Sequence, residues 1–322
     1  MAKTKEIQQR IKSVKNTKKI TKAMEMVAAA KMRKSVEAVL KTRSYANLSW
    51  MTILNISNST NSLYERHPLL SYKKEIKKVC IVLITANRGL CGSLNTSMVN
   101  KAIKSIELNN NIQTDFILLG KRGSSVYRKG HEIIAEFEKN DALTEVTEVR
   151  PLAKMIINDY LTDKYDKVMV AYTDFINAVT QEPRIKQIIP VDITKEDEYL
   201  GIVGEDSRLG TNKEYIQKKE KKYLKSETKD PYLKNAKFDY TFEPSAEKVL
   251  NEMIPRLIEV QLFQALLESN ASEHSARMNA MRNATSAASD IIDELTLFYN
   301  KARQASITSE IAEISAGANA LK

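Results

Sequence analysis

The segment best suited to binding or chemistry is a glycine-containing loop that follows an apolar run. Its sequence is ANRGLCGS at 86–93, and glycines between a strand and a helix can cradle a phosphate group. The loop lacks both the G-x-G-x-x-G spacing of dinucleotide-binding folds and the lysine of a P-loop. The GKRGSS run at 120–125 lacks the first P-loop glycine, because residue 115 is Asp. We therefore favour a tight turn that packs strand against helix over a nucleotide site.

The cysteines and histidines form no catalytic or metal-binding pattern. Cys91 lies in the glycine loop near Arg88, which could lower its pKa, but no histidine neighbours it in sequence. The other cysteine and the three histidines are scattered along the chain: Cys80, His67, His131 and His274. Of these, His274 lies in a polar stretch of predicted helix. We expect packing or surface roles for them, with no catalytic, cofactor-binding or metal-binding residue in the chain.

The glycine loop belongs to a predicted α/β domain at 75–194. Short apolar runs at 78–85, 115–120 and 167–172 are typical of strands, and helical patterns separate them at 94–108, 121–129 and 144–162. This alternation predicts a parallel, doubly wound, Rossmann-like sheet. Residues 180–189 follow the last strand closely enough to return as an antiparallel edge hairpin.

The two ends of the chain, 1–57 and 245–317, are predicted to be long helices that pair as one antiparallel coiled coil. Residues 3–57 contain no Gly or Pro, and Ile7, Ile11 and Val14 fall on one helical face. The second helix is predicted to begin near Ser245 and to stop at Gly317, with a kink or restart at Pro255.

Steps of three and four residues indicate which positions meet in the coiled coil. The predicted seam of the C-terminal helix consists of Ala288, Ile291, Leu295, Phe298, Ala302, Ala305, Ser309, Ala312 and Ala316. The predicted stripes on the N-terminal helix are Ile20, Met24 and Val27, and then Ala28, Met32, Val36 and Leu40. The Ala/Ser half of the seam buries little apolar area, so we expect another protein to enclose this end.

The positive charge of the chain is concentrated at its N-terminus. Residues 1–43 hold 13 Lys and Arg against three Glu, and Lys12, Lys15, Lys19 and Lys22 form a basic stripe. Such a stripe fits a nucleic acid or an acidic protein, and the lack of aromatic residues in 1–44 favours the protein. The longest apolar run, 79–84, is too short to cross a bilayer, and the N-terminus resembles no targeting segment.

Two segments closely resemble the gamma subunit of bacterial F-type ATP synthases. They are KITKAMEMVAAAKMRKS at 19–35 and SEHSARMNAMRNATSAASDIIDELTLFYNKARQASITSEIAEISAGANAL at 272–321. ITSEIAEISAGANA at 307–320 is similar to the C-terminal signature of that family, and ANRGLCGSLNT at 86–96 is similar to its loop after the first strand. The order of helix, α/β domain and returning helix also matches, so the resemblance covers about residues 1–190 and 238–322.

The resemblance implies a non-catalytic rotor subunit without a cofactor. One such chain threads a ring of three alpha and three beta subunits, contacts the epsilon subunit, and stands on the membrane c-ring that proton flow turns. It would lie at the cytoplasmic face of the bacterial plasma (inner) membrane, attached as a peripheral protein through the complex only.

The family's partner contacts carry over to seven positions. On the N-terminal helix Met24 would pack against a catalytic subunit, and on the C-terminal helix Arg303 and Gln304 would hydrogen-bond the surrounding ring. Further contacts would fall on Arg277, Thr308 and Glu310. Tyr240, in FDYTFEP at 238–244, resembles the family's aromatic residue near the proton-driven ring.

Residues 195–237 depart from the family and leave their role open. They hold 10 Lys, one Arg and nine acidic residues, which is typical of a solvated insertion. The segment has no cysteine, so the thiol switch of plant chloroplast members is not supported, whereas an epsilon contact or a brake on reverse rotation stays open.

Two functions of other classes also stay open. An enzyme built on the α/β domain would bind a nucleotide or turn over substrate alone. A coiled-coil nucleic-acid adaptor would bind DNA with a steep salt dependence.

Overall fold

The computed structural model describes most of the chain as two compact units. The described residues are 2–59, 67–73, 75–107, 112–140, 145–191, 243 and 245–320. One unit consists of residues 1–30 with 277–322, and the other of residues 31–276. Tyr240 and the insertion at 195–237 lie outside the described residues.

The larger unit is built on a five-stranded sheet with the order β3-β2-β1-β4-β5. Its strands are β1 (Lys78–Ile84), β2 (Gln113–Leu119), β3 (Ile133–Phe137), β4 (Lys167–Phe175) and β5 (Gln181–Ile189). The first four strands pair in parallel, and β5 pairs antiparallel with β4 at the edge of the sheet. The predicted parallel sheet and its antiparallel edge strand are therefore confirmed, while β3 had no counterpart in the prediction.

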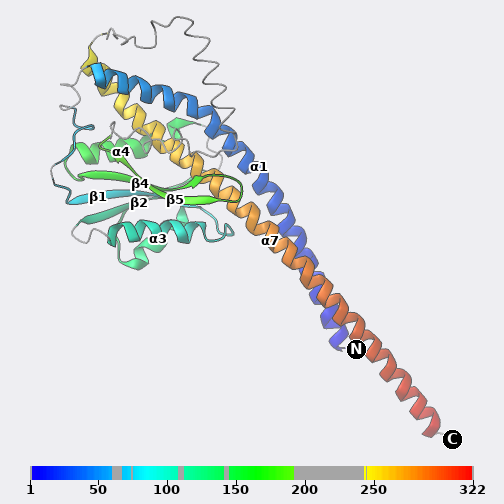
Figure 1. The fold of residues 1–322 in the computed structure, drawn as a ribbon. Coiled ribbons are helices and arrows are strands. Elements are labelled where there is room, and N and C mark those ends of the chain that lie inside the picture. The colour runs from blue at the N-terminus through cyan, green and yellow to red at the C-terminus, as the bar shows by residue number, and fades with distance from the viewer. Residues whose placement is uncertain are drawn as a thin grey trace, which may run out of the picture. The chain divides into compact units, whose positions relative to one another are not determined.

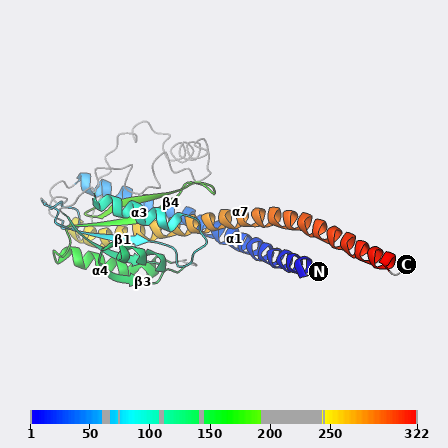
Figure 2. The same ribbon diagram turned by 90° about the horizontal axis from the view of Figure 1, so that it is seen from below.

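Side chains of β1 alternate between two apolar cores, one on each face of the sheet. Ile81 and Leu83 pack with residues of α3 (Leu94–Glu107), including Met98. Val82 and Ile84 face the other core, which contains residues of α4 (Arg150–Leu161) such as Ile156. Figures 1 and 2 accordingly show α3 and α4 on opposite faces. A central parallel strand covered on both faces must be apolar throughout, which explains the unbroken run at 79–84.

Two long helices each contribute residues to both units. They are α1 (Ala2–Ser59) and α7 (Ala246–Ala320), and within the larger unit both contribute to the core beside α4. Thr42 Oγ1 of α1 donates a hydrogen bond to Gln264 Oε1 of α7 over 2.8 Å. Helix α7 continues through Pro255 and past Gly317, so the helix does not end at the predicted glycine.

Helix α7 carries a polar segment, 268–275, in which every residue is buried. Ser272 Oγ donates to the backbone oxygen of Thr173 over 3.1 Å, and Ser275 Oγ donates to that of Ala178 over 2.7 Å. His274, for which the sequence predicts a surface or structural role, is one of the buried members. This segment therefore binds α7 to the chain at and just beyond the end of β4 by hydrogen bonds as well as by apolar contact.

The regions that connect the strands include two 3₁₀ helices. They are η1 (Lys121–Lys129) and η2 (Val146–Val149), the latter leading directly into α4. Just before η1, Gly120 has a φ of 105°, and a Cβ built on it would lie 2.2 Å from the backbone oxygen of Thr85. The chain after β2 therefore passes the end of β1 at a distance that only glycine permits.

Candidate functional site

The smaller unit consists of the beginning of α1 and the end of α7, which lie side by side and run in opposite directions. Thr285 Oγ1 donates to Thr21 Oγ1 over 2.8 Å, and Arg282 Nε lies 3.2 Å from Glu25 Oε1. Of these two contacts, the one that lies further along α1 lies earlier along α7, so the helices are antiparallel. The last part of α7 extends past the start of α1 (Figure 1).

The inward-facing positions of both helices recur at steps of three and four. On α1 the buried and half-buried positions include Ile7, Ile11, Val14, Lys18, Thr21, Glu25 and Ala28, with Met24 of the predicted stripe also half-buried. On α7 they are Met278, Met281, Thr285, Ala288, Ile292, Leu295, Tyr299, Ala302 and Ser306. The predicted periodicity is present in both helices, although some of the predicted members do not face inward.

Several apolar residues assigned to the seam are largely exposed, although Phe298 lines a pocket together with Ile7 of α1. Ile291 and Phe298 are 44% and 51% exposed, and Ile292 and Tyr299 take the inward positions beside them. On α1 Ile20 and Val27 are likewise exposed, since Thr21 and Ala28 face inward. The prediction was wrong for Ile20, Val27 and Ile291, while polar contacts between the helices are made by Thr21 with Thr285 and by Glu25 with Arg282.

Glu25 is the buried carboxylate of this seam, and cations from both helices compensate its charge. Lys22 Nζ lies 3.0 Å from Glu25 Oε2, while Arg282 approaches the other oxygen. The hydrogen bond from Lys22 lowers the pKa of Glu25, burial opposes that shift, and the hydrogen bond from Arg282 adds to the lowering. The carboxylate is therefore held in its charged form between the helices.

The outer surface of the paired helices combines exposed apolar side chains with exposed cations. The large exposed apolar residues are Ile20, Met26, Val27, Ile291, Leu297, Phe298, Ile307, Ile311 and Ile314. The basic stripe Lys12, Lys15, Lys19 and Lys22 is also exposed. Since so many apolar groups at the surface of one unit mark a contact with another protein, this surface is the candidate functional site.

The residues assigned by resemblance are distributed over this unit and do not converge on one point. Met24 and Arg277 are half-buried, and the remaining four on α7 are exposed: Arg303, Gln304, Thr308 and Glu310. Thr308 Oγ1 donates to the backbone oxygen of Gln304 over 2.9 Å, and Ser306 Oγ donates to Glu310 Oε1 over 3.3 Å. Sequence reasoning did not single out Leu297, Ile307, Ile311 or Ile314, which belong to the exposed apolar surface described above.

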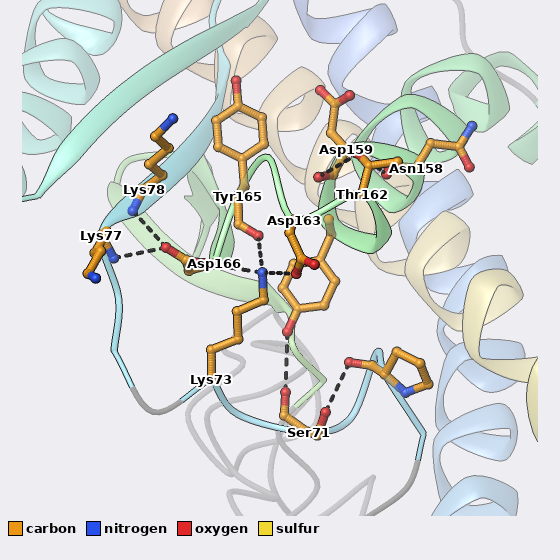
Figure 3. Close-up of polar contacts among 12 residues, drawn as sticks. Ser71, Lys73, Lys77, Lys78, Asn158, Asp159, Thr162, Asp163, Tyr165 and Asp166 are labelled. Atoms are coloured by element: carbon orange, nitrogen blue, oxygen red, sulfur yellow. Dashed lines mark hydrogen bonds and ion pairs between the residues drawn. The ribbon is translucent and has the colours of Figure 1, made fainter.

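A cluster of ionisable side chains in the larger unit holds the segment before β1. Lys73 Nζ lies 2.7 Å from Asp163 Oδ1 and 3.2 Å from Asp166 Oδ1 (Figure 3). Asp166 Oδ2 accepts the backbone N–H groups of Lys77 and Lys78, each over 2.9 Å. Because its polar atoms are engaged by one another and by the backbone, this cluster serves as a structural anchor for the start of β1.

Replacing Asp166 by Asn should weaken this anchor and remove an acid-dependent part of the stability. Burial raises the pKa of Asp166, but the N–H groups of Lys78 and Lys77 and the Lys73 ammonium outweigh it, so the pKa is lowered. A lowered carboxyl pKa stabilises the fold above the unfolded value of about 4, and this contribution is lost as the pH falls through the folded pKa. In urea unfolding between about pH 2 and 7, the free energy of unfolding of Asp166→Asn should fall less on acidification than that of the unaltered chain. Equal slopes in the two proteins would contradict this role.

The remaining reactive side chains support the expectation of packing roles. Burial raises the pKa of the Cys80 thiol to about 12, which leaves it un-ionised near neutral pH. His67 Nε2 lies 3.0 Å from Asn251 Oδ1, and the rings of His131 and Phe116 meet edge to face at 5.6 Å. Within the part of the chain that the structure describes, no group of His, Cys, Asp and Glu could hold a metal, and no helix is long and apolar enough to cross a membrane.

Comparison with known proteins accounts for nearly the whole chain. The ATP synthase family model ATP-synt matches residues 3–321. An ATP synthase gamma chain of Herpetosiphon aurantiacus is 39% identical over 329 residues, spanning 100% of this chain and 99% of that relative. The chain belongs to the ATP synthase gamma-chain family. A gamma chain of Legionella pneumophila (strain Corby) is 35% identical over 324 residues, spanning 100% of both chains.

Solved structures share the fold of this gamma-chain family member. A chain of the Euglena gracilis mitochondrial ATP synthase, in an assembly of OSCP, F1 and c-ring, matches with a TM-score of 0.61 at 18% identity. That match covers 99% of this chain and 95% of the other. A chain of the Tetrahymena thermophila central stalk and c-ring matches with a TM-score of 0.54 at 24% identity, covering 82% of this chain and 99% of that one.

Proposed function

We propose that this gamma-chain family member is the central-stalk rotor that couples proton-driven ring rotation to ATP synthesis and hydrolysis in separate catalytic subunits. It has no active site of its own in this proposal. The observation that carries it is the exposed apolar and basic surface on the unit formed by the two chain ends. The antiparallel contacts and the three-and-four spacing further support a left-handed coiled coil in this unit, with a Rossmann-like domain inserted between its helices.

The coupling follows from the asymmetry of a single chain among identical partners. Contacts of one helix pair with three copies of a catalytic subunit differ, so each copy is biased toward a different conformation. Rotation exchanges these biases, and the reciprocity of binding free energies lets ATP hydrolysis turn the pair in return. The basic stripe fits acidic surfaces on those subunits, and the exposed isoleucines near the end of α7 fit an apolar bearing.

The proposed partners are the alpha and beta subunits of F1, with one gamma chain for three of each, together with the epsilon subunit and the membrane c-ring. Solved assemblies with similar folds contain F1 and a c-ring, which supports these partners. The chain would act at the cytoplasmic face of a bacterial plasma membrane and bind the membrane only through the complex. Tyr240 would lie near the c-ring in this arrangement.

Individual contacts are proposed for the six residues on the paired helices. Met24 packs against the catalytic subunit, and Arg303 and Gln304 hydrogen-bond the ring around the end of α7. Arg277, Thr308 and Glu310 add polar contacts along the same helix. Their half-buried or exposed positions support these roles, because a side chain must reach the surface to touch a partner.

Substitution of Arg303 by Ala or of Met24 by Lys should reduce ATP-driven proton pumping by about fivefold or more, which corresponds to about 1 kcal/mol of coupling free energy. The measurement is the quenching of a pH-sensitive dye in membrane vesicles that contain the assembled complex, normalised to the rate of ATP hydrolysis. Met24→Leu is the conservative control, and Arg128→Ala removes an exposed cation from the larger unit. Both controls should pump normally.

Unchanged pumping in Arg303→Ala and Met24→Lys would remove the special roles of these two residues. The rotor itself has a separate test in the stoichiometry of the purified complex. A ratio other than one chain to three catalytic subunits would contradict it, as would ATP hydrolysis by the purified chain alone.

A further inference from the structure

A cavity of about 650 Å³ opens on the larger unit beside the glycine loop that follows β1. The loop forms one wall, α3 forms a second, and η1 forms the third. Its volume falls within the range of small-molecule sites, and it lies beyond the carboxyl ends of β1 and β2, where open α/β sheets bind ligands. The rotor function proposed above assigns it no role.

The polar groups around this cavity are cations, hydroxyls and amides. Arg122 and Lys129 come from η1, together with the Ser125 hydroxyl, and Thr96 and Asn100 come from α3. None of the lining residues is acidic. A wall with two cations and no carboxylate has a positive potential, which favours an anionic ligand.

Within the described part of the chain, neither cation forms an ion pair with a carboxylate. Lys129 Nζ donates to the Asn100 amide oxygen over 2.8 Å. Among the described residues Arg122 forms no ion pair, whereas its neighbour Lys121 lies 3.7 Å from Glu138. An anion in the cavity would therefore meet two cations without first displacing an acidic side chain.

The glycine loop holds Arg122 close to its own backbone. The Arg122 backbone N–H donates to the backbone oxygen of Ala86 over 3.0 Å, which joins the start of η1 to the loop. A Cβ built on Gly89 would lie 3.4 Å from an Nη atom of the Arg122 guanidinium, so this side chain runs along the loop in van der Waals contact. The backbone of Arg122 is thus fixed beside the loop, which keeps its exposed side chain within reach of the cavity.

We propose that this cavity binds a small phosphate-bearing anion through Arg122 and Lys129, with Thr96 and Ser125 as hydroxyl donors. Guanidinium and ammonium groups are the side chains best suited to phosphate oxygens. The lining contains no aromatic ring that could stack on a base, so the phosphate and not a nucleoside is recognised. This agrees with the absence of a dinucleotide-binding fingerprint from the loop and extends the proposal beyond the rotor function.

Calorimetric titration of the full-length chain at constant ionic strength tests this site with inorganic phosphate, ATP and adenosine as separate probes. We expect saturable binding of phosphate or ATP, with a dissociation constant of about 1 mM or below, and no binding of adenosine. Arg122→Gln with Lys129→Gln should weaken that binding by about tenfold or more. If phosphate binds more tightly than ATP, the natural ligand is the free phosphate ion. If ATP binds more tightly, the natural ligand is a nucleotide that is held by its phosphates.

Lys101→Gln is the matched control, because Lys101 is an exposed cation on α3 that does not line the cavity. This variant should bind as the unaltered chain does, and circular dichroism should show that all variants are folded. If Lys101→Gln lost as much affinity as the double variant, the binding would depend on general surface charge. That result would contradict the proposed site. Absence of saturable phosphate and ATP binding, or tight binding of adenosine, would overturn it as well.

Discussion

Replacement of Glu273 by Gln should lower the free energy of unfolding by about 3–5 kcal/mol, because it leaves the buried Lys139 ammonium without its counter-charge. Lys139 Nζ lies 2.7 Å from Glu273 Oε2, and the two side chains are 0% and 1% exposed. The pair joins the chain just after β3 to the polar segment of α7, so its loss should loosen that helix from the sheet. Urea unfolding of the full-length chain, followed by circular dichroism, measures the effect.

Two further variants separate this explanation from a general effect of charge removal. Glu37→Gln breaks the pair of Glu37 with Lys41, whose side chains are 65% and 74% exposed, and should leave the midpoint of unfolding nearly unchanged. The double replacement Lys139→Met with Glu273→Leu should recover most of the loss, since neither charge is then buried alone. A double variant as unstable as Glu273→Gln would show that the segment needs the ion pair itself.

Replacement of Gly120 by Ala should destabilise the chain by about 3 kcal/mol or more, combining backbone strain with overpacking. The new Cβ would lie 2.2 Å from the Thr85 backbone oxygen, and φ at this position is 105°. No side-chain rotation relieves a contact with backbone, so β1 and β2 would have to separate where Thr85 N–H donates to Leu119. The midpoint of thermal or urea unfolding provides the measurement.

Gly130 offers a control that also has a positive φ but no neighbour, although its ψ of 13° lies in the left-handed helical region and that of Gly120 is 141°. Its φ is 87°, and nothing lies within 4 Å of a Cβ built on it. Gly130→Ala should therefore show the backbone strain alone, about 1–2 kcal/mol. Equal effects at the two glycines would mean that the approach to Thr85 is not what requires Gly120.

The sheet was predictable from the sequence to the extent that its strands are buried on both faces. β1 and β4 lie at the centre, so their apolar runs are nearly continuous and stand out. β3 lies at the edge, is only half-buried, and carries Glu136 within a five-residue strand. An edge strand this short has no distinctive pattern, which explains why it was not found.

The polar segment of α7 could not be placed from the sequence for a different reason. Helical periodicity cannot distinguish a buried polar face from a solvated one unless its partners are known. Those partners, Lys139, Thr173 and Ala178, are about a hundred residues or more away along the chain. For His274 the sequence leaves a surface role and a structural role open, and the structure shows that it is buried.

The candidate site shows the same limit in its details. The sequence predicted the two long helices and the spacing of their contact positions, since periodicity is a local property of a helix. Periodicity in one helix does not tell which of two neighbouring rows of residues faces the other helix. Contacts such as that of Thr21 with Thr285 join residues from opposite ends of the chain. The individual partner contacts came from family resemblance, and the experiments on Met24 and Arg303 are their test.

The ion pair between Glu25 and Arg282 has a consequence for how the two helices can slide along each other. If α1 moved by one heptad toward the C-terminus of α7, Glu25 would face Ser289 and its buried charge would lose the guanidinium. The repeating apolar contacts tolerate such a step, whereas the contact of the buried Glu25 carboxylate with Arg282, whose side chain is 64% exposed, is specific to one register. The pair thus fixes the register of the two helices, and with it the number of residues of α7 that extend past the start of α1. This register in turn sets how far the exposed end of α7 can reach into a partner.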